Sequence, residues 1–308
     1  MEDRIKKAYK LMERCSLCPR RCGVNRIKGK IGFCRAGIKP MVSSFHPHFG
    51  EEPPISGYNG SGTIFLTHCS LRCVYCQNYP ISQLGEGREV SVEDLASMML
   101  ELERQHCHNI NFVTPTHYMP QILEAIFIAR EKGLRLPLVY NCGGYESLEA
   151  LEILDGVVDI YMPDMKYSDN EVAKKYSNAP DYFEINKLAV KEMYRQVGDL
   201  KIVRGIARRG LLIRHLVLPG GLAGSEAIFD FIVKELSPRT YVNIMAQYYP
   251  CHLAHNFPEI DHRITHQEYI KVLRIAQRKG LENGFKQALD TINRKHIPDW
   301  TDNLKELI

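Results

Sequence analysis

Short β-rich runs alternate with helical segments from about Gly62 onward, and this alternation constrains the fold more than any other feature of the sequence. One helix is predicted to begin at Ser91, because Asp94 three residues later completes a capping-box pattern. Strands that alternate with helices predict right-handed βαβ units around a parallel sheet. The predicted strands are "GTIFLT", "NINFVT", "LPLVYN", "VDIYMPDMKY", "GLLIRHLVLPG" and "YVNIMAQYYP". Six strands favour a partial (β/α)6, TIM-like barrel over a closed eight-stranded one.

Polar side chains follow each predicted strand. The carboxyl ends of parallel strands lie on one rim of an α/β sheet, and functional sites lie at that rim. The sequence therefore predicts one site to which all six strands contribute. The contributing residues are Thr67 to Cys69, Thr114 to His117, Asn141 to Gly144, Asp164 to Lys166, Arg214 with His215, and Gln247 to Tyr249.

Residues 1–60 differ in character from this core. They contain four cysteines and many basic and turn residues, and they show little strand or helix pattern after Glu13. The stretch "HPHFGEEPPISGYNGSG" is a Pro/Gly-rich connector to the first core strand. We therefore expect a cysteine-rich N-terminal segment (1–60), a barrel core (61–252) and a C-terminal helical extension (253–308).

Charge and hydropathy argue against several classes of partner. The net charge is only +4, and no basic block is interleaved with aromatic residues, which argues against nucleic acid. No apolar run approaches the ~20 residues that span a membrane, and "MEDRIKKAYKLMERC" lacks the pattern of a signal peptide. We expect a cytoplasmic protein. Its ten cysteines then indicate metal ligands rather than disulfides.

Three of these cysteines, Cys69, Cys73 and Cys76, lie within "THCSLRCVYCQN", directly after the first predicted strand. Thiolates are soft ligands that hold iron–sulfur clusters or zinc. A 4Fe–4S cluster usually takes four thiolates, so three would leave one iron without a protein ligand. An open coordination position is what a catalytic metal needs. A zinc site completed by a distant histidine is the alternative.

The CxxxCxxC spacing, its place after the first strand, and Tyr75 before the third cysteine resemble the radical S-adenosylmethionine (SAM) superfamily. The resemblance implies that Cys69, Cys73 and Cys76 hold a 4Fe–4S cluster whose open iron is chelated by SAM. It implies that reductive cleavage of SAM yields a 5′-deoxyadenosyl radical, which abstracts hydrogen from a substrate. It also implies an anaerobic setting and an electron donor such as flavodoxin or ferredoxin.

The stretches "CSLCPRRCGVNR", "GKIGFC" and "HFGEEPPISGYNGSGTIFLTHCSLRCVYCQN" resemble a more specific branch, that of the pyruvate formate-lyase activating enzymes, and within it a group of uncharacterised homologues. The resemblance covers most of the chain. Activating enzymes make a glycyl radical on a partner protein, which implies a protein substrate. A small metabolite is the alternative substrate, and a non-catalytic metal-bound electron carrier is a third hypothesis.

The chain departs from the activating enzymes after its second predicted strand. It has "TPTH", residues 114–117, where those enzymes carry Gly-Gly-Glu-Pro to hold the cofactor's amino group. Thr114 and Thr116 could still receive the ammonium through their oxygen atoms. His117 is either a group for proton transfer or a residue at the entry of the next helix.

Other cofactor contacts are implied at the ends of later strands. Asp164 and Lys166 match an Asp-x-Lys pair of the activating enzymes and point to the same side. They could bind the ribose hydroxyls and the carboxylate of SAM, or they form an ordinary ion pair at the rim. Arg214 resembles a cofactor-binding arginine, whereas His215 has the opposite parity on the same strand. Asn141 either lines the pocket or belongs to a turn, and Tyr75 counts as a cofactor contact.

Cys107 follows a predicted helix and is interpreted as a small packed or surface residue. The other remaining cysteines fall into two sets. Cys15, Cys18, Cys22 and Cys34 provide four thiolates, which close a site and suit structural zinc or a second 4Fe–4S cluster acting as an electron relay. Cys142 and Cys251 follow strands at the predicted rim and either donate a hydrogen atom or are passive pocket residues.

Overall fold

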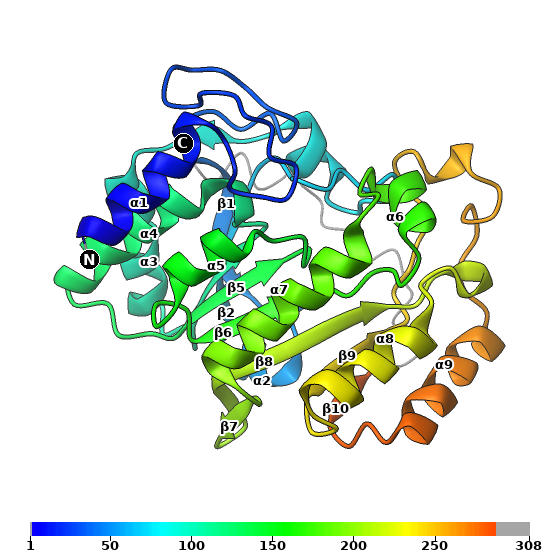
Figure 1. The fold of residues 1–308 in the computed structure, drawn as a ribbon. Coiled ribbons are helices and arrows are strands. Elements are labelled where there is room, and N and C mark those ends of the chain that lie inside the picture. The colour runs from blue at the N-terminus through cyan, green and yellow to red at the C-terminus, as the bar shows by residue number, and fades with distance from the viewer. Residues whose placement is uncertain (1, 288–308) are drawn as a thin grey trace.

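The computed structural model describes residues 2–287 and contains the six predicted strands as consecutive parallel neighbours (Figure 1). The predicted partial barrel is therefore confirmed. Each strand of the series forms parallel backbone hydrogen bonds with the next one. The strands are β2 (Ser61–Leu66), β4 (Ile110–Val113), β5 (Leu138–Cys142), β6 (Ile160–Pro163), β8 (Ile206–Leu216) and β9 (Tyr241–Met245).

Helices cover the outer face of this sheet (Figure 1). The predicted capping box at Ser91 forms, since Ser91 and Asp94 exchange hydrogen bonds at the start of α3. The stretch 170–197 forms two helices, because Asn178 ends the first one in a left-handed conformation (φ 53°) and Pro180 follows. The helices are α3 (Val92–Arg104), α4 (Met119–Glu131), α5 (Leu148–Leu154), α6 (Asn170–Ser177), α7 (Tyr182–Val197), α8 (Ser225–Phe231) and α9 (His266–Lys279).

The N-terminal segment is more regular than predicted. After α1 (Glu2–Glu13), the chain forms β1 (Met41–His48), which pairs antiparallel with β2 and, at its other edge, with β3 (Arg88–Glu89). The sequence shows little strand pattern after Glu13, so β1 was not predicted. Pro47 weakened the strand pattern, although proline is tolerated in a strand near the edge of a sheet.

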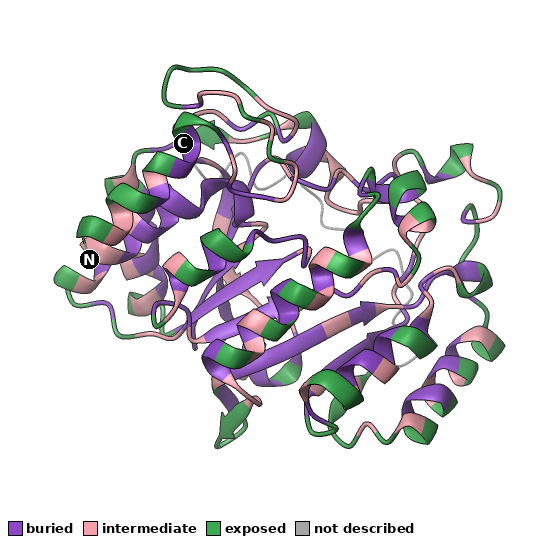
Figure 2. Ribbon diagram, viewed as in Figure 1, coloured by how far each residue is buried: buried purple, intermediate pink, exposed green. Residues whose placement is uncertain are grey.

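A short helix, α2 (Pro53–Ser56), closes the amino-terminal end of the barrel. Its Ile55 is fully buried and belongs to a cluster of apolar residues from β5, β6 and β8. The strands themselves are buried along most of their length (Figure 2). The cluster therefore forms a floor, above which the interior of the barrel is polar. Its core members are Val139, Ile160, Met162 and Leu212.

The carboxyl-terminal part adds α9 and β10 (Gly284–Lys286), which pairs parallel with β9. A further short strand, β7 (Lys201–Val203), forms a hairpin with β8. The last part of the expected C-terminal extension, residues 288–308, lies outside the described residues. Within residues 2–287, no helix combines the length and apolarity that crossing a bilayer requires.

Candidate functional site

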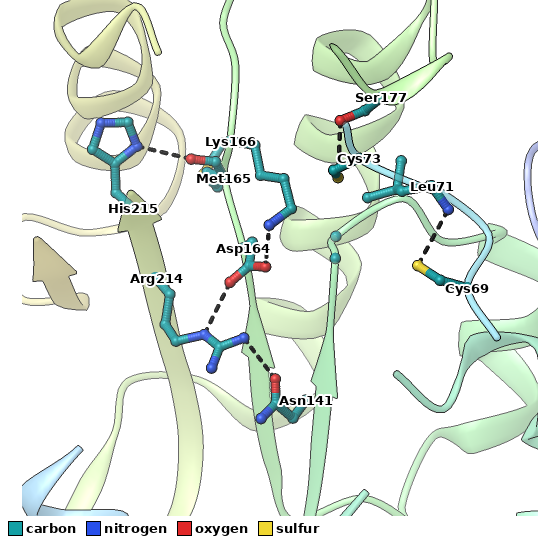
Figure 3. A network of polar contacts seen from close by, with 12 residues as sticks. Cys69, Leu71, Cys73, Asn141, Asp164, Met165, Lys166, Ser177, Arg214 and His215 are labelled. Carbon is teal, nitrogen blue, oxygen red and sulfur yellow. Dashed lines mark hydrogen bonds and ion pairs between the residues drawn. The ribbon is translucent and has the colours of Figure 1, made fainter. Parts of the chain in front are cut away.

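The three-cysteine loop leaves the carboxyl end of β2 and turns back sharply. His68 and Arg72 both adopt positive φ angles of 67° and 59°, which is uncommon for residues other than glycine. The backbone N–H of Leu71 donates to Cys69 Sγ at 3.4 Å, so the turn closes on the first thiol (Figure 3). Cys73 is buried, whereas Cys69 and Cys76 are partly exposed.

The local surroundings of these thiols fit a metal cluster. Ser177 Oγ donates to Cys73 Sγ at 2.9 Å, and Ser82 Oγ lies 3.2 Å from Cys76 Sγ. Burial raises the pKa of Cys73 and raises that of Cys76 to about 12, and the neighbouring thiols add to both shifts. Three thiolates held so close together would repel one another without a bound cation, and an iron–sulfur cluster supplies that charge.

A cluster also accounts for the spacing of the thiols. A 4Fe–4S cluster binds each thiolate to a different iron, so its ligands do not meet at one point. The donor set therefore fits a cluster with one open iron.

A cavity of about 200 Å³ lies beside this loop at the carboxyl ends of the strands. It is lined by one group of residues from the loop and by others that follow β6, β8 and β9. The cavity thus joins two of the thiols to polar residues far away in the sequence. The lining residues are Cys73, Tyr75, Cys76, Gln77, Asn78, Asp164, Lys166, Arg214, Leu216, Met245, Gln247, Tyr248 and Tyr249.

Asp164 is the centre of an ionic network in this cavity (Figure 3). Lys166 Nζ lies 2.6 Å from Asp164 Oδ2, and Arg214 Nε donates to Asp164 Oδ1 at 2.9 Å. Arg214 also donates to Asn141 Oδ1 at 2.6 Å. Burial alone would raise the pKa of Asp164, but Arg214 and Lys166 outweigh it and hold that pKa below its usual value. Asp164 is therefore a carboxylate with one cation on each side.

The neighbouring His215 points away from this network. Its Nδ1 donates to the carbonyl of Met165 at 2.8 Å (Figure 3). Its Nε2 lies 2.8 Å from Ser225 Oγ. Burial lowers the pKa of His215 to about 4, so the ring is neutral at pH 7. Alternation along β8 thus places Arg214 in the cavity and His215 in the layer of helices.

The residues after β4 lie outside the cavity lining. Thr116 Oγ1 donates to Glu146 Oε1 at 2.7 Å, and Thr114 has a positive φ of 61°. His117 Nε2 donates to the carbonyl of Thr67 at 2.8 Å, and burial lowers its pKa to about 3. Proton transfer by His117 stays a prediction, and the low pKa makes the ring a weak base at neutral pH.

Three further groups, Cys142, Glu146 and Cys251, lie at or after the carboxyl ends of β5 and β9. Cys142 is 2% exposed and does not line the cavity, whereas Cys251 is partly exposed and donates to the carbonyl of Tyr75 at 3.3 Å. Glu146 is a buried carboxyl group that the sequence did not single out. Burial raises its pKa to about 7, although hydrogen bonds from Thr116 and Tyr140 oppose the shift.

Sequence reasoning also missed Glu51 and Glu52, which precede α2 and enter the barrel interior. Glu51 Oε1 accepts from Asn111 at 2.9 Å and from Asn141 at 3.3 Å, and Glu51 Oε2 lies 3.6 Å from Arg214 Nη1. Glu52 Oε1 accepts from Asn243 at 2.6 Å. One signal was available: these two glutamates are the only acidic residues between positions 14 and 85.

The four N-terminal cysteines lie beside the same rim. Cys15, Cys18 and Cys34 are buried, and burial raises the pKa of Cys18 and Cys34. The thiols also influence one another, since nearby cysteines add to both shifts.

Arg20, within this cysteine-rich segment, connects it to the three-cysteine loop. Its guanidinium donates to the carbonyls of Ser70 at 2.9 Å and Ser177 at 3.0 Å, and it also bonds to Asn178. The two cysteine groups are therefore neighbours in space.

Comparison with known proteins adds the family context. The model of the radical SAM superfamily matches residues 63–206. An uncharacterized protein of Methanocaldococcus jannaschii is 32% identical over 292 residues, which are 92% of this chain and 80% of that protein. The pyruvate formate-lyase-activating enzyme of Staphylococcus aureus is 26% identical over 168 residues, which are 51% of this chain and 61% of that enzyme.

Solved structures agree on the fold. HydG, a maturase of the FeFe-hydrogenase, superposes with a TM-score of 0.50 at 12% identity, over 73% of this chain and 50% of that one. At this identity the likeness concerns the fold alone. The residues matched by the family model include the three-cysteine loop and the Asp164–Lys166 pair.

Proposed function

The chain belongs to the radical SAM superfamily and is an enzyme of that class, and from this premise we propose that Cys69, Cys73 and Cys76 are its cluster ligands. When bound, the cluster supplies the electron that cleaves SAM, and the resulting 5′-deoxyadenosyl radical abstracts hydrogen from the substrate. The observation that carries this proposal is the shared cavity, which two of the three thiols line together with Asp164 and Lys166.

The chain's own residues would bind and orient SAM in this cavity. Lys166 carries the positive charge for the carboxylate of SAM, and Asp164 accepts from its ribose hydroxyls. Arg214 fixes Asp164 from the opposite side, and Asn141 holds Arg214 in turn. Tyr75 lines the same cavity.

The residues after β4 and β5 have less direct proposed roles. Thr114 and Thr116 are proposed to receive the ammonium of SAM, which requires the cofactor to extend beyond the present cavity lining toward β4. Cys142 as a hydrogen-atom donor stays a prediction, which requires access to a side chain that is now buried.

The substrate is proposed to be a glycyl residue of a partner protein. The similarity to the activating enzyme of Staphylococcus aureus supports this class of substrate. A small metabolite is the second candidate substrate. Flavodoxin or ferredoxin is the proposed class of electron donor in either case.

The four N-terminal cysteines are proposed to hold zinc or a second 4Fe–4S cluster. Iron, acid-labile sulfide and zinc should be measured per chain on anaerobically purified protein. About four irons with one zinc would indicate a structural zinc site, and about eight irons without zinc would indicate a second cluster.

The proposed reaction is tested by the products of SAM cleavage. The anaerobically reconstituted enzyme, reduced with dithionite, is expected to form 5′-deoxyadenosine and methionine in equal amounts. Cys73→Ala should abolish both products, whereas Cys107→Ala should retain them, because Cys107 lies in neither cysteine group. Absence of both products from a wild-type enzyme with a full cluster would refute the proposed function.

A further inference from the structure

Two glutamates, Glu52 buried and Glu51 partly buried, lie directly beneath the proposed SAM cavity. Arg214, which lines the cavity, has Glu51 on its inner side at 3.6 Å. Glu52 is bonded to Asn243 on β9, and Met245, two residues further along that strand, again lines the cavity. Residues two apart on a strand share a face, so Asn243 and Glu52 lie one layer below the cavity.

In this layer, the buried polar atoms that lack a hydrogen-bond partner are all acceptors. Glu52 Oε2, Asn111 Oδ1 and Asn243 Oδ1 are buried and have no hydrogen-bond partner among residues 2–287. All three atoms are acceptors. Each buried acceptor that lacks a donor costs about 1–3 kcal/mol, so three of them in one layer indicate a place for a group rich in N–H donors.

The layer and the cavity above it also contain more carboxyl groups than cations. The ion pairs here join two cations, Lys166 and Arg214, to the carboxyl groups of Asp164 and Glu51, and the field of Arg214 also reaches Glu52. Three carboxyl groups thus share two positive charges. Burial raises the pKa of both Glu51 and Glu52, and Arg214 only partly opposes this. One further positive charge would keep all three carboxylates ionised.

We propose that Glu51 and Glu52, with Asn111 and Asn243, form the binding site for a positively charged group of the substrate, an alkylammonium or a guanidinium. The inference rests on the proposed function, because it places the substrate next to the SAM cavity. The apolar floor around Ile55 closes the site from below, so the cationic group enters from the cavity and its neighbouring carbon atoms lie toward the cofactor.

This chemistry could come from two sources. One is a free amine or guanidine metabolite, and the other is a lysine or arginine side chain of a protein. A glycyl residue within a peptide carries no positive charge. The site therefore favours a substrate other than the glycine loop of a glycyl-radical protein.

The test is calorimetric titration of the reconstituted full-length enzyme under anaerobic conditions. The cationic probes are n-butylammonium and methylguanidinium, and the neutral isosteres are n-butanol and methylurea. We expect the cations to bind at least about tenfold more tightly than the neutral probes. Glu52→Gln should remove this preference, and the exposed control Glu149→Gln should retain it.

Nα-acetyl-lysine methylamide and Nα-acetyl-arginine methylamide distinguish the two sources. Binding of these peptide mimics as well as the small amines would assign the site to a protein side chain, and binding of the small amines alone would assign it to a metabolite. Equal binding of cations and neutral probes by the wild type, or no binding of any probe, would overturn the inference and leave water as the occupant. Because the titration needs no SAM cleavage, that outcome would leave the proposed function standing.

Discussion

At the scale of single residues, Asp164 is the point where the side chains of three strand ends meet. It binds Lys166 from its own strand end and Arg214 from β8, and Arg214 continues to Asn141 on β5. This arrangement keeps two cations apart by placing a carboxylate between them. Without that negative charge, Lys166 and Arg214 would repel each other.

Asp164→Asn is therefore expected to weaken SAM binding by about one to two orders of magnitude. The measurement is equilibrium binding of SAM to the reconstituted protein. Glu171→Gln, at the exposed start of α6, is the matched control and should bind SAM as the wild type does. Unchanged affinity in Asp164→Asn would remove this residue from the cofactor site.

Glu146 gives a pH-dependent prediction at the same scale. Burial raises its pKa from 4.5 to about 7, so the folded state holds the proton more tightly than the unfolded chain. The contribution of Glu146 to the free energy of unfolding is fully present below pH 4.5. It falls by about 3 kcal/mol as the pH rises from 4.5 to about 7. Glu146→Gln stays neutral and should flatten the fall in Tm over this range.

The control for this prediction is Glu149→Gln, which changes an exposed glutamate close by in the sequence. It should keep the wild-type dependence of Tm on pH. Parallel curves for Glu146→Gln and the wild type would show that Glu146 titrates normally in the folded protein.

At the scale of secondary-structure elements, the helix α2 lies below the acidic layer, which consists of Glu51, Glu52, Asn111 and Asn243. Ile55 is fully buried among residues of β5, β6 and β8. Ile55→Ala should leave a cavity and lower the free energy of unfolding by about 2–5 kcal/mol, seen as a lower Tm. Ile38→Ala, at a residue that is 41% exposed, should change Tm little. Equal effects of the two variants would contradict the assignment of α2 as the floor.

The six barrel strands could be predicted because each has a local signal: a β-rich run followed by turn residues and a helical pattern. The strand β1 could not, because Pro47 and two histidines interrupt its apolar pattern and its pairing with β2 is a tertiary contact. The break between α6 and α7 depends on one left-handed residue, Asn178, which propensity alone does not identify. Tertiary context decided these elements.

One part of the candidate site could be predicted from the sequence, and another part could not. The cysteine loop was visible because its ligands are separated by only two and three residues in the sequence. The acidic layer was not visible, because Glu51 meets a residue 90 positions away and Glu52 meets one 191 positions away. No periodicity of the sequence encodes such contacts.

At the scale of the whole molecule, the N-terminal segment and the barrel form one unit at the rim. Arg20 joins the two cysteine groups through the carbonyls of Ser70 and Ser177. If a metal folds the segment, its loss should affect both parts. The double substitution of Cys18 and Cys34 by serine should lower the metal content and expose the Arg/Lys-rich stretch around them to trypsin.

The parallel strands should survive as a protected fragment in that experiment, because their mutual hydrogen bonds do not involve the N-terminal cysteines, although Cys15 and Cys34 pack against the same apolar core. Cys107→Ser is the control and should retain the metal and the resistance to trypsin. A double variant that resists trypsin as the wild type does would show that the segment folds without metal.

The acidic layer has a consequence for how proteins of this kind diverge. Glu51 and Glu52 precede residues 63–206, the part that the superfamily model matches. Natural selection could therefore change the two glutamates of the acidic layer within one short stretch of sequence. The part of the chain that generates the radical would stay constant. Lineages that differ between positions 41 and 60 would then share one reaction and transform different molecules. Exchanging this stretch between homologues is a route to redirecting the enzyme by design.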